Sequence, residues 1–248
     1  MKTIYILWLR QLKRYFRSKS RIIGSLAQPL LFLVSLGYGF GPVFQKAGQG
    51  NYIDFLAPGI IGMSIIFSSI FSGMEIIWDR QFGFLKETLV APVSRLSIMI
   101  GRTLGGTTVA LMQGVIVFLI AMVAGFHPYN FALLPLAILV MLLVAFLFTA
   151  LGTMIASLLS DMQGFQLIMN FLIMPLFFLS GALFPLQGLP KAITTIASLD
   201  PLSYGVDAFR TLLTGVTHFG LGLDILVLSG VTLLFLVLGS YFFSKIQI

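Results

Sequence analysis

Hydrophobic residues gather along the chain in six runs, each close to the length of a membrane crossing. The runs occupy residues 22–41, 55–77, 102–125, 132–158, 165–185 and 222–243. A helix of about 20 apolar residues spans the hydrocarbon core of a bilayer. The first run contains Gln28 and Pro29, which such a helix tolerates when neighbouring helices satisfy the freed backbone groups. The pattern predicts an all-α integral membrane protein with six transmembrane helices.

Three segments lie outside these runs, at residues 1–21, 78–101 and 186–221, and none is long enough for a soluble domain. The whole chain, 1–248, is therefore expected to form one transmembrane domain. In the first segment, residues 3–17 predict a helix with an apolar face of Tyr5, Trp8, Leu9, Leu12 and Phe16 and a basic face of Arg10, Lys13, Arg14 and Arg17. Such a helix lies in the membrane interface. It either anchors the chain to lipid or also forms a docking surface for a cytoplasmic partner.

Composition and charge agree with a membrane protein. Hydrophobic residues make up 58% of the chain and charged residues 9%, against about 25% in a soluble domain. Twelve of the fifteen lysines and arginines fall on one side of the predicted topology, which predicts that both termini lie in the cytoplasm. Most of these residues flank apolar runs, so the net charge of +7 indicates contact with membrane lipids and not with nucleic acid.

The sequence offers little chemistry for catalysis. It has no cysteine, and its two histidines, His127 and His218, fall in predicted external loops. No G-x-x-x-x-G-K-[ST] phosphate-binding loop is present. We therefore expect no enzyme activity, no bound metal and no bound cofactor in this chain. Glu75 lies near the cytoplasmic end of the second run, where a cap or an ion pair is expected, although a functional role stays open.

The predicted cytoplasmic loop contains FGFLKETLVAPVSR at residues 82–95. Phe84, Leu85, Thr88 and Leu89 would form the apolar stripe of a short helix that ends before Pro92. A short amphipathic helix between two transmembrane helices offers a contact for another protein. The alternative is an interfacial helix that rests on lipid.

The predicted external segment contains SGALFPLQGLP at residues 180–190 and DPLSYGVDAFR at residues 200–210. Prolines interrupt the chain where the fifth transmembrane helix ends, which predicts short re-entrant helices that dip into the outer leaflet between helices five and six. Irregular backbone at that depth lines a pathway or an interface. Asp200 is expected to cap a helix or start a turn. Asp207 and Arg210, three residues apart on a helix, can pair with each other.

Together these segments resemble the permease subunits of ATP-binding-cassette exporters of the second type, a group that contains bacterial drug-resistance and polysaccharide exporters. The resemblance covers nearly the whole chain. It depends on the layout of six transmembrane helices, on FGFLKETLVAPVSR at 82–95, and on SGALFPLQGLP followed by DPLSYGVDAFR. The family often has Asn where Asp200 stands, which leaves the chemistry of that cap open.

The resemblance implies a dimer, built with a second copy or a related permease, above two cytoplasmic ATPase subunits that bind ATP and Mg²⁺. Residues expected to couple to the ATPase are Gly83, Phe84, Leu85, Glu87, Thr88, Leu89 and Pro92. The interfacial helix would contribute Trp8, Arg10, Lys13, Arg14 and Arg17. The exit region would contain Gly181, Phe184, Pro185, Pro190, Pro201, Tyr204, Asp207 and Arg210.

The expected function is export of a hydrophobic or amphipathic substrate, such as a drug, an antibiotic or a lipid-like molecule, driven by the separate ATPase. A lipid-linked polysaccharide is the second substrate class. Six transmembrane helices also suit a secondary transporter or a channel, but those classes place charges or broken helices near the membrane midplane. A membrane scaffold without transport activity is a further alternative.

Overall fold

The computed structural model describes residues 2–46, 50–84 and 92–245, and within these ranges the chain is helical with no β-strand. Its elements are α1 (Lys2–Arg17), α2 (Lys19–Lys46), α3 (Tyr52–Ser72), α4 (Met74–Gln81), α6 (Arg95–Val123), the 3₁₀ turn η1 (Phe131–Leu133), α7 (Leu134–Leu158), α8 (Met162–Leu179), α9 (Lys191–Leu199), α10 (Pro201–Thr214) and α11 (Leu221–Ser244). Six helical segments are long and apolar enough to cross a membrane. The prediction of an all-α membrane protein with six transmembrane helices is confirmed.

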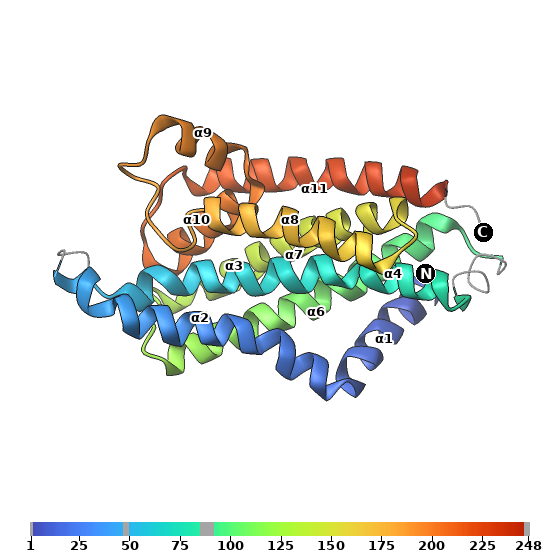
Figure 1. Ribbon diagram of the computed structural model, residues 1–248, viewed down its shortest axis with the longest axis horizontal. Coiled ribbons are helices and arrows are strands. Elements are labelled where there is room, and N and C mark those ends of the chain that lie inside the picture. Colours follow the sequence, from blue (N-terminus) through green and yellow to red (C-terminus); the bar gives the residue numbers. More distant parts are fainter. Residues whose placement is uncertain (1, 47–49, 85–91, 246–248) are drawn as a thin grey trace.

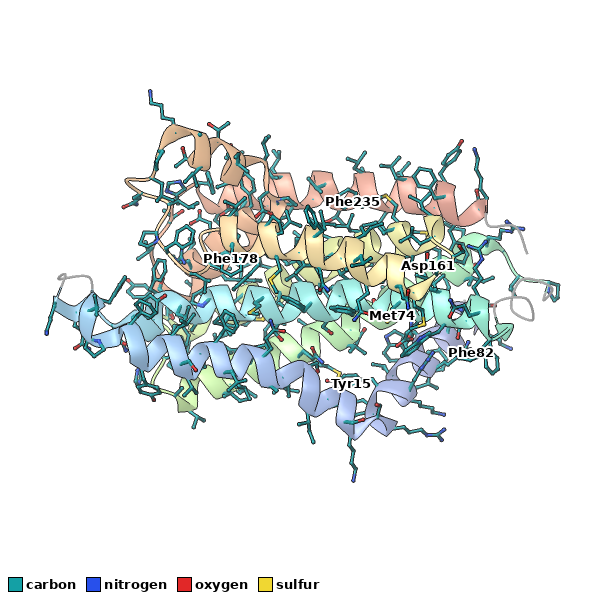
Figure 2. The ribbon with its side chains drawn as sticks, in the orientation of Figure 1. Tyr15, Met74, Phe82, Asp161, Phe178 and Phe235 are labelled. Carbon is teal, nitrogen blue, oxygen red and sulfur yellow. The ribbon has the colours of Figure 1, made fainter. Side chains whose placement is uncertain are left out.

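The long helices run side by side around α3 and α7 (Figure 1). In the crossing formed by α3 and α4, 78% of the most apolar 18-residue stretch is buried. In the crossings formed by α2 and by α11, the buried share of that stretch is 17%. The outer helices expose large apolar side chains such as Phe171 and Leu226, as helices that face lipid must. Figure 2 shows α8 running from Asp161 at one end of the bundle towards Phe178 near α9 and α10.

Several helices extend beyond the apolar runs. Residues 78–81 belong to α4, and residues 95–101 form the first turns of α6, so part of the expected loop 78–101 is helical. The Ser94 hydroxyl accepts the N–H of Ser97 and thereby caps the start of α6. The second crossing is interrupted at Gly73, where α3 ends and α4 begins. Apolar composition located the crossings, whereas local capping determines where the helices end.

Glycines allow the central helices to meet backbone to backbone. A Cβ atom added to Gly73 would lie 2.4 Å from the carbonyl oxygen of Gly152, and one added to Gly152 would lie 2.7 Å from the carbonyl oxygen of Ile70. On α6, a Cβ at Gly101 would lie 3.0 Å from Ile4 O, and one at Gly105 would touch the Gln11 side chain. Small residues at such positions let membrane helices approach closely. Gly101 and Gly105 thus form part of the surface on which α1 packs.

The helix predicted at the N-terminus is present as α1, which packs along α6 at a steep angle to α2 (Figure 1). Its Leu7 and Tyr15 are buried, and Trp8 Nε1 donates to Thr108 Oγ1 at 3.0 Å. Tyr5 and Phe16 stay exposed. The amphipathic helix is therefore confirmed, but it uses protein contacts as well as an outward apolar face.

The contact between Gly73 and Gly152 can be tested with Gly152→Ala. The added methyl group meets the backbone of α3, which cannot move aside, so we expect a loss of about 1–3 kcal/mol of unfolding free energy. Thermal unfolding in detergent measures the change. Gly39→Ala, in the exposed part of α2 with nothing within 4 Å of the new methyl group, should be neutral or slightly stabilising. Equal effects of the two substitutions would contradict the close contact.

Candidate functional site

Asp79 on α4 is the centre of a buried ionic cluster at the end of the bundle that carries α1 and the start of α6. We call this end the basic end. One carboxylate oxygen of Asp79 accepts from Arg102 Nη2 on α6 at 2.6 Å, and the other accepts from Arg10 Nη2 on α1 at 3.2 Å. Arg14 Nη1 lies 3.7 Å from both Asp79 and Glu75. The cluster therefore joins α1, α4 and α6.

The energetics of this cluster depend on its burial. The side chains of Asp79 and Arg102 are 6% and 4% exposed, so neither charge is solvated by water. Removing one partner of a buried ion pair leaves an uncompensated charge and costs about 3–5 kcal/mol. Arg14 and Arg10 are only partly buried, and their guanidinium groups also lie over the rings of Trp78 and Phe84, respectively. The expected ion pair of Glu75 is present.

The sequence analysis did not assign Asp79 and Arg102 to a site. Glu75 and Asp79 are four residues apart on one helix, as are Arg10 and Arg14 on another, so two acidic and two basic groups each share a helical face. That spacing was a usable signal for a paired contact. The position of Arg102, on a third helix, was not available from spacing.

An open groove lies beside the cluster, between α1 and α4. Its volume is about 1,010 Å³, and it is lined by the basic residues Arg10, Lys13, Arg14, Arg17 and Lys19 and by the aromatic residues Trp78, Phe82 and Phe84. Lys13 and Arg17 are exposed, whereas Arg10 and Arg14 turn towards α4. Figure 2 shows Phe82 at the basic end of α4. The groove combines positive charge with an apolar wall.

A second cavity, of about 410 Å³, lies further along the bundle between α2, α3, α4 and α6, and shares Trp78 with the groove. Its polar lining residues are Ser25, Gln28, Ser68, Glu75 and Gln113, and its apolar ones include Phe67, Phe71 and Met74. Gln113 Nε2 donates to Tyr15 Oη and Ser25 Oγ, so this side chain on α6 bonds to both α1 and α2. Figure 2 shows Tyr15 at the junction of α1 and α2. A cavity with apolar walls and few polar groups suits an amphiphile.

Of the residues predicted to couple to an ATPase, the structure describes Gly83, Phe84 and Pro92, which lie between α4 and α6 at the basic end. Gly83 follows α4 with φ +81°, a conformation that glycine adopts without strain, and Phe84 is exposed. Pro92 is exposed as well. Leu85, Glu87, Thr88 and Leu89 lie outside the residues that the structure describes, so their helix stays a prediction.

At the opposite end of the bundle, α10 packs against α11 and α3, and α9 lies next to α10 (Figure 1). Pro190 precedes α9 and Pro201 is the first residue of α10. Gly181 has φ +73°, and Tyr204 Oη donates to Ser198 O at 2.8 Å. The other expected exit residues, Phe184 and Pro185, belong to the loop between α8 and α9. The structure thus gathers these residues at one end, while their depth in a membrane stays a prediction.

The expected pairing of Asp207 with Arg210 is wrong. The Asp207 carboxylate accepts the N–H groups of His218 at 2.8 Å and Phe219 at 2.7 Å, and so holds the loop before α11. Arg210 Nη2 instead donates to the carbonyl oxygens of Gly181 and Phe55 at 3.0 and 3.4 Å. The i, i+3 spacing permits an ion pair, but each side chain finds backbone partners in other segments.

Asp200 caps α10, as predicted, and accepts the N–H of Leu202 at 2.8 Å. The residue is 4% exposed. Burial raises the pKa of the Asp200 carboxyl from 3.8 to about 7, although the hydrogen bond from Leu202 acts in the other direction.

Substitution of Asp79 tests the ionic cluster. Asp79→Asn leaves Arg102 buried without a counter-ion, so we expect a loss of about 3–5 kcal/mol of unfolding free energy in detergent. Replacing Arg102 as well, in Asp79→Asn with Arg102→Met, should recover part of that loss. Arg17→Gln, an exposed arginine on the same helix as Arg10, serves as the control and should change little. A double variant less stable than Asp79→Asn alone would contradict this account.

The pKa of Asp200 predicts a pH dependence. Because the folded-state pKa lies above the unfolded value, the folded protein binds the proton more tightly, so this group favours folding in acid. That contribution is complete below about pH 4 and is lost as the pH rises to about 7. Asp200→Asn keeps a capping oxygen without titrating. The unfolding free energy of the wild type minus that of Asp200→Asn should therefore fall between these pH values; a constant difference would contradict it.

Comparison with known proteins places both ends of the bundle in one family. A family model described as ABC-2 type transporter matches residues 2–214, which include the Asp79 cluster and Arg210. The putative transport permease ycf38 of Pyropia yezoensis is 32% identical over 228 residues, covering 87% of this chain and 75% of that protein. The protein of the same name from Cyanophora paradoxa is 30% identical over 219 residues, covering 86% and 74%.

A bacterial relative shows the same breadth of similarity. Nodulation protein J of Rhizobium leguminosarum bv. trifolii is 28% identical over 213 residues, covering 85% of this chain and 78% of that protein. The similarity thus extends over most of each protein and is not confined to one motif. The chain therefore belongs to the ABC-2 type transporter family of membrane permeases.

Proposed function

We propose that this chain is the transmembrane subunit of an exporter driven by separate ATPase subunits. The observation that carries the proposal is the Asp79 cluster, which joins α1, α4 and α6 directly beside the segment expected to contact the ATPase. The sequence lacks a phosphate-binding loop, so ATP and Mg²⁺ would be bound by the partner. The permease itself would then act without enzyme activity.

The basic end would face the cytoplasm of a bacterial inner membrane. Lysines and arginines of cytoplasmic loops determine orientation in the membrane, and most of those in this chain belong to α1, to the start of α2 and to residues 80–102. The N-terminal helix and the end of α11 lie at this same end (Figure 1). Both termini would thus be cytoplasmic, and α9 and α10 would lie on the external side.

The cluster supports a mechanical role. A force applied to residues 82–95 by an ATPase would act first on α4, because Phe82 and Gly83 directly follow that helix. Asp79 would transmit the displacement to α6 through the short, buried contact with Arg102 and to α1 through the partly buried contact with Arg10. The same displacement would alter the cavity lined by Glu75 and Trp78. ATP-driven changes in the partner would in this way reach the substrate path.

The cavity beside Trp78 supports a hydrophobic or amphipathic substrate, such as a drug, an antibiotic or a lipid-like molecule. Its aromatic walls would take the apolar part, and Gln28 and Ser68 would offer hydrogen bonds. The adjacent basic groove, with Lys13 and Arg17, favours a second class, lipid-linked polysaccharide, because such molecules carry an anionic group next to the lipid. A second permease subunit, identical or related, would complete the path between the two protomers.

Co-purification tests the proposal. The chain, expressed with the ATPase encoded nearest to its gene, should purify as a complex whose ATP hydrolysis drives transport in vesicles. Glu87→Arg reverses a charge in the predicted contact and should lower ATP-driven transport at least about tenfold, as truncating an interface contact of about 1.4 kcal/mol would. Lys46→Glu, a charge reversal at the opposite end, is the control and should leave transport unchanged.

Other results of this experiment would support a different function. If no ATPase associates, and the purified chain alone moves solute down a gradient, a channel or a secondary transporter replaces the exporter. An associated ATPase whose activity is unaffected by Glu87→Arg would remove residues 82–95 from the contact and leave the permease role in place.

A further inference from the structure

Arg210 on α10 is a buried cation with unused hydrogen-bonding capacity. Only 9% of the residue is exposed, and its guanidinium donates to two backbone carbonyl oxygens and lies 4.2 Å from the ring centroid of Phe55. Nε has no hydrogen-bond partner, and no ion pair joins Arg210 to a carboxylate in the part of the chain that the structure describes. Burying a charge without an ionic partner is costly. Asp207 acts on Arg210 only at longer range than an ion pair, so the guanidinium can still take a directly bound anion.

The nearest acidic side chain on the same helix is already engaged. Asp207 accepts three backbone N–H groups, from His218, Phe219 and Gly220, and holds the loop before α11. Its lone pairs are therefore directed at that loop. Burial lowers the pKa of the Arg210 guanidinium to about 10, which leaves it cationic at neutral pH. Asp207 also lines the cavity and its charge opposes this lowering, but its hydrogen bonds hold it on the loop, so an anion could contact the Arg210 cation directly.

A cavity of about 370 Å³ is next to this guanidinium. Four separate parts of the chain form it: the end of α2 with the start of α3, the loop after α8, the buried face of α10, and the loop before α11. Phe44, Leu186, Val216 and Phe219 give it apolar walls, and Thr214 and Asn51 add polar groups. The volume falls in the range of small-molecule sites, which combine apolar walls with a few placed polar groups. The cavity could hold a charged group and the hydrocarbon next to it.

We propose that this cavity binds the anionic group of an amphiphile, a phosphate or a carboxylate, with Arg210 as its counter-ion. The planar guanidinium matches the oxygens of such groups, and the charge-assisted bonds are stronger in a dry cavity than in water. Phe44 and Val216 would contact the adjoining apolar chain. The site is separate from the cavity beside Trp78, and it does not depend on the ATPase.

Substitution of Asp54 on α3 should change the affinity for the anion in the opposite direction to substitution of Arg210. Its carboxylate also lines the cavity, and one oxygen accepts the N–H of His127 at 3.4 Å. A negative charge here repels an anionic ligand, so Asp54→Asn should tighten binding while Arg210→Gln weakens it. A role for Arg210 that is only structural would not produce opposite changes at these two positions.

The experiment is calorimetric titration of the full chain in maltoside micelles with dihexanoyl phosphatidic acid, with heats of titration into empty micelles subtracted. We expect one saturable site. Arg210→Gln should raise Kd at least about tenfold, as the loss of one charge-assisted hydrogen bond would, and Arg210→Lys should raise it less. Asp54→Asn should lower Kd. Lys191→Gln, which removes an exposed charge on nearby α9, should leave it unchanged.

Control ligands and further variants define the results that would overturn the proposal. Dihexanoylglycerol, which lacks the phosphate, should not bind saturably, and its binding with equal affinity would overturn the role of the charge. Inorganic phosphate with the same Kd as the phosphatidic acid would overturn the assignment to an amphiphile. If Arg210→Gln fails to fold, the comparison of Arg210→Lys with Asp54→Asn still decides, and wild-type Kd values in both would overturn the site. An increase of Kd in Lys191→Gln equal to that in Arg210→Gln would also overturn the site.

Discussion

A charge that is buried away from water must find a partner, and this requirement shapes the basic end of the bundle. Asp79 is buried because α4 continues α3 into the packed interior, so its carboxylate needs cations from other helices. Arg102 supplies one from within α6, and Arg10 supplies one from α1. The angle of α1, the position of α4 and the register of α6 are therefore linked by one side chain. The groove lies beside this cluster, and the cavity beside Trp78 lies next to it between α2, α3, α4 and α6.

The two ends of the bundle satisfy their buried charges in different ways. At the basic end, side chains neutralise one another across three helices. At the opposite end, backbone groups take that role: Asp207 is held by the amides of a loop, and Arg210 by two carbonyl oxygens. Backbone hydrogen-bond partners orient a charged side chain but carry no opposite net charge. Ion pairs thus join the helices at the first end, whereas the second keeps a cation without a direct ionic partner next to a cavity.

The sequence predicted what depends on neighbouring residues. Apolar runs revealed six crossings, and Asp200 before Pro201 indicated a helix cap, because both signals are local. The Asp79 cluster could not be assembled in this way, since its partners lie 23 and 69 residues away along the chain. The proposed pair of Asp207 and Arg210 failed for the same reason. Its spacing was suitable, but residues 217–220 and Gly181 offered partners that helical spacing cannot reveal.

The break at Gly73 has a consequence for how the central helices can move. There α4 starts against Gly152 of α7 with no side chain on either surface, so two smooth backbones face each other. Packed side chains interlock and resist sliding, and proteins that shear along helix contacts do so by small displacements. A contact between two glycines has no such interlocking. The contact between α4 and α7 therefore opposes sliding of the two helices less than a contact between packed side chains would. A longer side chain at Gly73 or Gly152 would restore that resistance.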